Sequence, residues 1–418
     1  MEQSVDWGFV VVALLNLAFV LGLLLNMAGM LTWVERKQGA VMANRIGANR
    51  AYIPVPIPKK GGGWRWTRRF TLIGLFHTIA DGGKLMLKED YTPPFVDKYV
   101  YNLAPWFAVV PVLVTFAVIP FGGPFQPGVM LNDVFGFVGA NWAGEQALAL
   151  FGERIYNLQL ADLNVGLLFV FAIGSTGIFS AALAGWASNN KYSLMGALRS
   201  SSQMISYEVF MGMAILGLLV CYGTVDMNQI AQIQGDLWFG FIPSWGVFLQ
   251  PHMLFVFTVA LMAENKRVPF DMPEAESELV AGYFTEYSAM KMGLFMMAEF
   301  LEIAVIAGLV TALFFGAYHV PGVHAVTDSW YWAQHATATA PAANLVFGME
   351  VPHAVVIGIR VSAFLGKLAF LCWFQILIRW SLPKFRYDQI MRLGWKILLP
   401  ISIVNLLLTA IVVAFVTQ

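Results

Sequence analysis

The densest group of ionisable residues runs from Ala263 to Tyr287, where carboxylates far outnumber basic side chains. Its acids are Glu264, Asp271, Glu274, Glu276, Glu278 and Glu286. Pro273 is well placed to begin a short helix, on which Glu274 and Glu278 would share one face. When carboxylates are buried together, desolvation and mutual repulsion raise their pKa, so some stay protonated near neutral pH. The pattern indicates a group that can take up and hand on protons, with a solvated acidic loop as the alternative.

Three more acids lie in apolar surroundings. Glu299 and Glu302 fall in one apolar stretch and would share a helical face, and Glu208 opens another stretch. Ionisable groups inside a membrane are costly, so these acids are candidates for function, although a neighbour or a water could satisfy Glu208. In one continuous helix Glu286 and Glu299 would lie about 20 Å apart. Together the acids could extend a proton route along and across the helices.

A second cluster follows the first apolar stretch and contains Glu35, Arg36, Lys37, Arg45 and Arg50. Arginine is well suited to holding a carbonyl or a carboxylate in a fixed geometry. The cluster therefore predicts a polar pocket, although basic residues that merely flank a membrane span would look similar.

Residues 77–90 form an amphipathic stretch that would lie at a membrane surface. Within it Asp81 and Lys84 are three residues apart and can pair on one helical face. The preceding residues 51–73 look like a loop insertion, whose basic and Trp side chains could touch anionic headgroups or be plainly solvated.

Composition identifies the elements that must position these clusters. Of 418 residues, 58% are hydrophobic and 12% are charged, whereas a soluble domain carries ~45–50% apolar and ~25% charged residues. A helix crosses a bilayer with about 20 apolar residues. Such stretches occur at about 7–34, 101–119, 163–187, 206–222, 247–263, 287–317, 354–378 and 397–416. We expect an all-α polytopic membrane protein with about eight transmembrane helices and a membrane-surface amphipathic helix.

The basic residues predict the orientation of this single transmembrane domain, 1–418. Nearly all those outside the apolar stretches fall in the loops 35–100, 188–205, 264–286 and 379–396, which should lie inside. Both termini should then face outward, as should two further insertion-like loops at about 120–162 and 318–353.

Several function classes lack support. The net charge of zero gives no electrostatic basis for binding nucleic acid, and two cysteines are too few for an iron–sulfur cluster. No dinucleotide-binding or phosphate-binding glycine motif occurs, and no cysteine or histidine spacing is typical of a metal site. Four histidines share the outer loop 318–353, where a metal site would be a minor alternative.

The chain resembles the H-subunit family of proton-pumping NADH–quinone oxidoreductase, respiratory complex I, to which mitochondrial NADH dehydrogenase subunit 1 belongs. The matching motifs, in the family's order, are Glu35-Arg36-Lys37 with NRIGANR (44–50), IADGGKLMLKED (79–90), LRSSSQMISYE (198–208), residues 264–287, MAEF (297–300) and PKFRYDQIMRLGWK (383–396).

The resemblance implies a membrane-arm subunit that forms the channel through which quinone enters and the start of the carboxylate proton path. The residues implied for the quinone channel are Glu35, Arg36, Arg45, Asp81, Arg379 and Arg386. Those implied for the proton path are Glu208, Glu264, Asp271, Glu274, Glu276, Glu278, Glu286 and Glu299.

It also implies the surroundings. Ubiquinone or menaquinone would be the substrate, and NADH, FMN and iron–sulfur clusters would bind only to partner subunits. Those partners would be soluble iron–sulfur and quinone-pocket subunits, small membrane subunits and antiporter-like pump subunits. The membrane would be a bacterial inner membrane.

The sequence departs from the family at several positions. Ala48 replaces a usual Pro, His77-Thr78 a usual Gln-Pro, and Lys384 a usual Arg. Glu302 stands where the family has a neutral residue. Three alternatives stay open: a related membrane-bound hydrogenase complex that uses no quinone, a stand-alone ion transporter, and a passive anchor.

Overall fold

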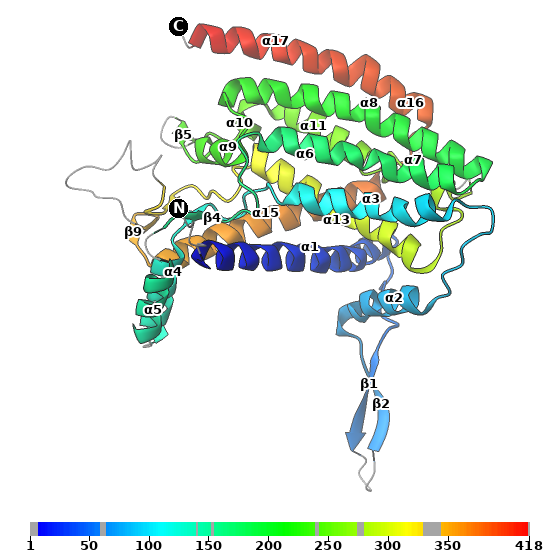
Figure 1. Ribbon diagram of the computed structural model, residues 1–418, viewed down its shortest axis with the longest axis horizontal. Coiled ribbons are helices and arrows are strands. Elements are labelled where there is room, and N and C mark those ends of the chain that lie inside the picture. Colours follow the sequence, from blue (N-terminus) through cyan, green and yellow to red (C-terminus); the bar gives the residue numbers. More distant parts are fainter. Residues whose placement is uncertain are drawn as a thin grey trace, which may run out of the picture.

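The computed structural model describes residues 7–58, 64–138, 141–151, 154–238, 242–273, 280–328 and 344–416. Long apolar helices lie side by side along the length of the molecule (Figure 1). Within the described ranges, seven are long and apolar enough to cross a membrane. They are α1 (Trp7–Met42), α3 (Lys98–Phe116), α6 (Gly166–Thr176) with α7 (Ile178–Ala187), α8 (Lys191–Tyr222), α13 (Ala289–Phe314), α15 (His353–Ser381), and α16 (Tyr387–Leu393) with η3 (Gly394–Leu398) and α17 (Leu399–Val416). The expected all-α polytopic fold is confirmed.

The span expected at 247–263 is divided into two helices. Helix α10 (Gly246–Leu249) ends at Gln250, and α11 (Pro251–Glu264) begins there. At 1.5 Å per residue, α11 is about 21 Å long, which is shorter than the hydrocarbon core of about 30 Å. Pro251 explains the break, because proline fits the first turn of a helix and cannot continue a preceding one.

Helix α8 begins earlier than expected, at Lys191, where Asn190 caps its first turn. Glu208 therefore lies in the middle of a helix and does not open one. Residues 199–203 are polar, so hydropathy placed the start of this helix too late in the chain. Among them, Gln203 is fully buried and donates to the carbonyls of Ala263 at 2.6 Å and Phe270 at 2.8 Å.

The segments expected as loops contain regular structure. Residues 51–73 hold an antiparallel hairpin of β1 (Ile53–Pro58) and β2 (Trp64–Phe70), followed by η1 (Leu72–Gly74), and the hairpin projects from the bundle (Figure 1). Residues 120–162 hold the paired helices α4 (Pro127–Val138) and α5 (Asn141–Phe151). Shorter elements are α2 (Phe76–Leu87), α9 (Met227–Ile233), η2 (Gly282–Phe284), and the strands β3 (Pro124–Phe125), β4 (Tyr156–Asn157), β5 (Leu237–Trp238), β6 (Ile242–Pro243), β7 (Val323–His324), β8 (Leu345–Val346) and β9 (Met349–Glu350).

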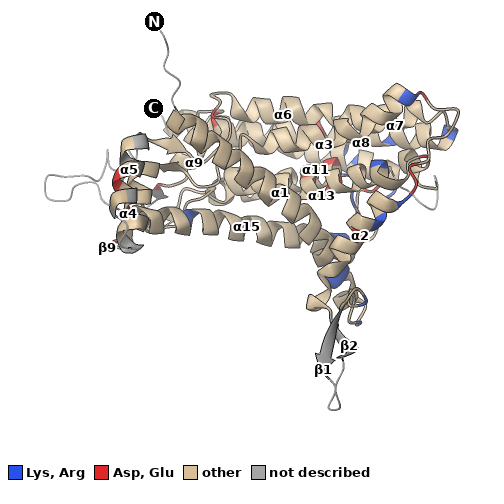
Figure 2. Ribbon diagram, turned by 60° about the horizontal axis from the view of Figure 1, so that its bottom comes forward, with Lys and Arg blue, Asp and Glu red and all other residues tan. Residues whose placement is uncertain are grey.

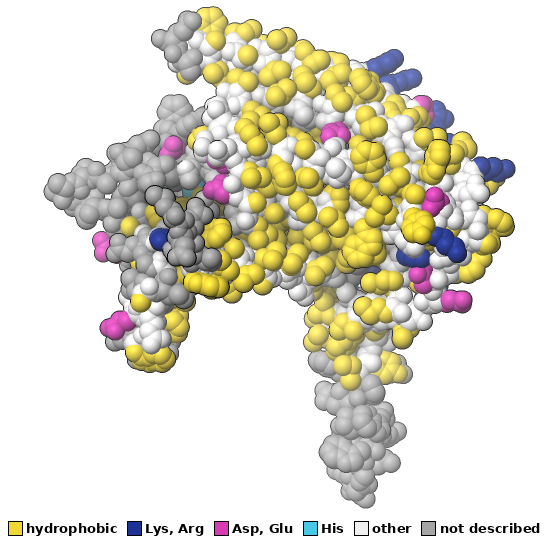
Figure 3. All heavy atoms as spheres, in the orientation of Figure 1, with side chains coloured by type: hydrophobic (Ala, Val, Ile, Leu, Met, Phe, Trp, Pro, Cys, Tyr) yellow, Lys and Arg dark blue, Asp and Glu magenta, His cyan; other side chains and the backbone are white. Residues whose placement is uncertain are grey.

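Charged residues gather at one end of the bundle. Lys and Arg cluster where α2 lies and where α7 turns into α8, whereas α1 begins and α17 ends at the opposite end (Figures 1 and 2). On the face drawn in Figure 3, hydrophobic side chains are spread over the bundle between these ends. Helices α1, α2 and α13, which carry several of the functional candidates, contact one another, and α11 contacts α13.

A close helix crossing supports this end. Gly196 of α8 faces Gly282 of η2, and a Cβ atom at Gly196 would lie 2.7 Å from the Gly282 Cα. Gly282 has a φ of 54°, a conformation that glycine adopts most easily. Only two residues without side chains allow the backbones to approach this closely.

Replacing Gly196 with Ala is expected to destabilise the protein by about 1–3 kcal/mol, because the added methyl group must push backbone aside. Gly212 on the same helix is the matched control, since a Cβ there meets nothing within 4 Å. Gly212→Ala should be neutral or stabilising, because alanine favours helix by about 1 kcal/mol over glycine. The thermal unfolding of both variants in mild detergent checks this; equal midpoints would contradict it.

Candidate functional site

Glu35, near the end of α1, is held by two arginines from distant parts of the chain. Its Oε2 accepts a hydrogen bond from Arg267 Nη1 at 2.9 Å, and its Oε1 lies 2.5 Å from Arg379 Nη1. Arg267 also donates from Nε to Glu299 Oε2 at 3.3 Å, and its guanidinium lies over the Phe300 ring. The Arg267 side chain is only 11% exposed. A largely buried guanidinium needs opposite charges close by to remain stable. Arg267 has two such partners, the carboxylates of Glu35 and Glu299.

A large cavity opens beside this network. It has a volume of about 470 Å³, is open on one side, and is bordered mainly by α1, α2 and α13. Apolar residues such as Leu25, Leu85 and Met297 form most of its wall. Arg36 and Asp81 line it as well and pair at 2.5 Å. A cavity with apolar walls and charged groups fits a ligand that has an apolar body and a polar head.

A second, much smaller cavity, of about 60 Å³, lies deeper among the helices. Its apolar wall comes from α3, α6, α11 and α13. The ionisable carboxylates and ammonium that line it are Glu208, Glu264, Glu299, Glu302 and Lys266. Four acids and one lysine therefore share one internal space, which we call the carboxylate cavity.

Glu299 connects the two cavities. Of the described residues, it alone lines both of them. Its partner Arg267 binds Glu35 on the side of the larger cavity. Glu35, Arg267 and Glu299 thus form a continuous chain of charges from one cavity to the other, which we call the ion bridge.

Two expectations about the positions of acids were wrong. Asp81 pairs with Arg36 on α1, and this contact, at 2.5 Å, replaces the local pairing expected with Lys84. Glu286 is not on the same helix as Glu299, because α13 begins only at Ala289. The Glu286 carboxylate instead accepts a hydrogen bond from Asn190 Nδ2 at 2.8 Å.

The remaining candidates lie around this centre. Asp271 is buried, and its Oδ2 lies 2.9 Å from the Lys384 ammonium, which lacks the fork geometry of a guanidinium. Arg45 lines a smaller cavity with Arg36. Arg386 is exposed and pairs with Asp388 at the start of α16, outside the residues that line the two larger cavities. Glu274, Glu276 and Glu278 lie outside the described residues.

Sequence reasoning missed Lys266 and Arg267, which are central to the site. Both were counted only as charges that balance the acidic stretch. The available signal was their position, since two adjacent cations interrupt a run of carboxylates. Arg267 contacts Glu35 from 232 positions away, so no local pattern reveals that pair.

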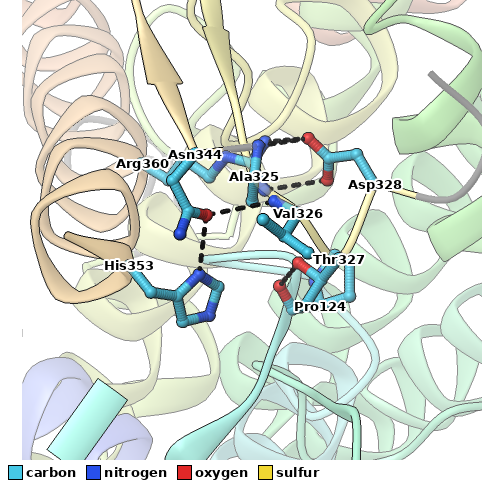
Figure 4. A network of polar contacts seen from close by, with 8 residues as sticks. All are labelled: Pro124, Ala325, Val326, Thr327, Asp328, Asn344, His353 and Arg360. Atoms are coloured by element: carbon cyan, nitrogen blue, oxygen red, sulfur yellow. Dashed lines mark hydrogen bonds and ion pairs between the residues drawn. The ribbon is translucent and has the colours of Figure 1, made fainter. Parts of the chain in front are cut away.

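It also missed an ion pair at the opposite end of the bundle (Figure 4). Arg360 on α15 and Asp328 are both fully buried. They are joined by Nη1 to Oδ1 at 3.0 Å and by a second contact from Nη2 to Oδ2. Asp328 Oδ2 also accepts from the Ala325 amide at 2.8 Å, and Asn344 Oδ1 contacts His353 Nδ1 at 3.1 Å. This network fastens the outer segment to the start of α15.

The outer histidines belong to the same region. Burial and the charges of Arg360 and Lys367 hold the pKa of His319 well below its ordinary value, so its imidazole is neutral near pH 7. Lys367 donates to the carbonyls of Phe315, Ala317 and His319 and so caps the end of α13. His335 lies outside the described residues. Among those described, no three His, Cys, Asp or Glu side chains are placed to hold a metal ion.

These features define a polytopic α-helical membrane protein in which buried charges connect two internal cavities. The profile of the family described as NADH dehydrogenase matches residues 14–410. The H subunit of NADH-quinone oxidoreductase from Flavobacterium johnsoniae is 35% identical over 97% of this chain and 96% of its own. The H subunit from Bdellovibrio bacteriovorus is 34% identical over 96% and 95%, and the H 2 subunit from Koribacter versatilis is 36% identical over 97% and 98%. The chain belongs to the family of NADH-quinone oxidoreductase H subunits.

Proposed function

We propose that the protein is a membrane-arm subunit of a redox-driven proton pump, NADH-quinone oxidoreductase. The larger cavity would admit quinone, and the carboxylate cavity would begin the proton path. The ion bridge would couple quinone reduction to proton translocation. The observation that carries the proposal is that Arg267 binds Glu35 and Glu299 at the same time.

The larger cavity has the chemistry that a quinone requires. Its apolar wall suits an isoprenoid tail, and Arg36, Asp81 and Arg379 supply polar contacts for the headgroup. Guanidinium groups hold a carbonyl oxygen in a fixed direction. This favours a quinone-using subunit over the hydrogenase-type relative.

Electrostatics explains how protonation at one end of the ion bridge would affect the other end. Quinone reduction consumes protons as well as electrons, so it changes the charge near Glu35. When Glu35 gains a proton it holds Arg267 less strongly, and Arg267 is then freer to stabilise the ionised form of Glu299. Because Glu299 also lines the carboxylate cavity, the change reaches Glu208 and Glu264 without movement of a whole helix.

The wider assignment rests on family membership. Arg45 and Arg386 would shape the channel mouth, and Asp271 and Glu286, with Glu274, Glu276 and Glu278, would belong to its junction with the proton path. Quinone would be the substrate, while NADH, FMN and iron–sulfur clusters would bind to soluble partner subunits. Small membrane subunits and antiporter-like subunits would complete the complex in a bacterial inner membrane, with both termini outward.

The test compares Arg36→Gln with Glu299→Gln in the intact complex in membrane vesicles. We expect Arg36→Gln to lower kcat/KM for a short-chain quinone at least about tenfold, because a charged hydrogen bond is worth ~1.5–3 kcal/mol. Electron transfer from NADH to ferricyanide, which needs no quinone channel, should be unchanged. Glu299→Gln should lower the number of protons moved per electron more than it lowers quinone reduction.

Exposed residues provide the controls. Arg392→Gln and Glu350→Gln remove the same charges at exposed positions that line neither cavity, and they should leave both activities intact. If Arg36→Gln lowers quinone reduction only in proportion to lost assembly, the anchor interpretation replaces the channel. If Glu299→Gln retains full proton coupling, the ion bridge is not the coupling route.

A further inference from the structure

The carboxylate cavity has an uneven set of charges. Of its acids, Glu299 is already bound to Arg267. Glu208, Glu264 and Glu302 remain, from three different helices. Lys266 is the only Lys or Arg among the described residues that line this cavity.

Lys266 and Arg267 are adjacent in the chain but line different cavities. Lys266 follows the end of α11 and has a φ of 57°, a left-handed conformation that is unfavourable for a residue with a side chain. Lys266 lines the carboxylate cavity, while Arg267 lines the larger cavity. Two adjacent cations thus line two different cavities.

Glu302 is the acid that best matches this lysine. It lies one helical turn beyond Glu299 on α13, on the same wall, where apolar Val305 and Leu309 continue the cavity. Glu302, Glu264 and Lys266 all line this one cavity, so their charges act on one another within a space that has apolar walls. An acid so surrounded by apolar residues needs a cation within reach to remain ionised.

We infer that Lys266 and Glu302 act as a charge pair that sets how many protons the carboxylate cavity holds. This rests on the function proposed above and adds two positioning residues to it. With Lys266 charged, one of Glu208, Glu264 and Glu302 can be ionised while the cavity keeps no net charge, so the other two hold protons. Removing either member of the pair changes this number by one.

The test measures proton-coupled quinone reduction of the intact complex in vesicles, with a short-chain quinone, across a range of pH. Lys266→Met should shift the ionisation that limits activity to higher pH by about one unit, because a carboxylate loses its cation. Glu302→Gln should shift it to lower pH, because the remaining acids lose a like charge. The other groups facing the cavity are Glu208 on α8, Glu264 on α11, Glu299 on α13 with its partner Arg267, and Tyr283.

The double variant separates a charge pair from two structural residues. Each single change should lower the proton-coupled rate about tenfold, and Lys266→Met with Glu302→Gln should recover it to within about threefold of the parent, since the net charge is restored. Lys98→Met and Glu350→Gln, both exposed, are matched controls. Losses that multiply in the double variant, or single variants with an unshifted pH profile, would overturn the inference.

Two further measurements keep the result unambiguous. If Lys266→Met does not assemble, Glu302→Gln alone must still give the acidic shift, and an unchanged profile refutes the pair. If Glu299→Gln uncouples the enzyme but the pair variants behave as the parent, the pair is wrong while the proposed function stands. If Glu299→Gln has no effect on coupling, the proposed function itself fails.

Discussion

Arg267→Met is expected to lower proton-coupled quinone reduction about a hundredfold or more. The Arg267 side chain is largely buried and pairs with both Glu35 and Glu299. Removing one partner from a buried ion pair costs about 3–5 kcal/mol, because the remaining charge is left without compensation. The two carboxylates would then take up protons and lose their electrostatic connection. Because coupling is proposed to pass through this connection, the proton-coupled rate should fall by at least about a hundredfold, which corresponds to ~2.7 kcal/mol in the activation barrier.

A comparison among arginines makes this result specific. Arg379 bonds Glu35, so Arg379→Met should weaken quinone reduction but leave the contact between Arg267 and Glu299. Arg392→Met, at an exposed position, should resemble the parent. The rate of quinone reduction and the protons moved per electron are measured together on assembled complex. Equal uncoupling by Arg267→Met and Arg379→Met would show that the bridge to Glu299 has no special role.

Asp328→Asn is expected to destabilise the protein by about 3–5 kcal/mol. The change leaves the fully buried guanidinium of Arg360 without its carboxylate. It also weakens the acceptor for the Ala325 amide. Thermal unfolding of the purified complex should therefore begin at a clearly lower temperature, and less of the chain should be incorporated.

Two comparisons test the origin of that loss. Replacing both partners, Asp328→Leu with Arg360→Met, should recover much of the stability, because apolar residues often replace a buried ion pair at little cost. Asp388→Asn breaks the exposed pair with Arg386 and should have little effect, since solvent screens such pairs. An Asp328→Asn variant as stable as Asp388→Asn would contradict the buried-pair explanation.

The membrane helices could be predicted from sequence because apolar length alone defines them. The errors occurred where tertiary contacts override hydropathy. Helix α8 contains polar residues that its neighbours satisfy, as Gln203 shows, so its first turns looked like a loop. The hairpin β1–β2 forms by pairing between its own two strands. The prolines in β1 argue against a strand when the sequence is considered alone, because proline cannot donate a backbone hydrogen bond.

The site was predicted in its residue types more than in its pairing. Glu35, Arg36 and Asp81 were expected at one channel, and they line one cavity. Arg267 was overlooked because its two partners come from α1 and α13, and only the packing of these helices brings them together. Arg360 lies in the apolar stretch at 354–378, but its partner Asp328 lies in a segment without any periodic pattern. The roles of these residues in quinone binding and proton transfer stay predictions.

The length of α1 has a consequence for a substrate that is dissolved in lipid. Its 36 residues give about 54 Å of helix, and Glu35 lies about 42 Å from its first residue. The hydrocarbon layer is only about 30 Å thick, so Glu35 stands about 12 Å beyond it when α1 begins at the far edge. The larger cavity starts along α1 at Leu25, about 15 Å before Glu35. A quinone headgroup would therefore leave the hydrocarbon layer along the apolar wall of this cavity. Because protein replaces lipid around the tail, the movement would expose little apolar surface to water.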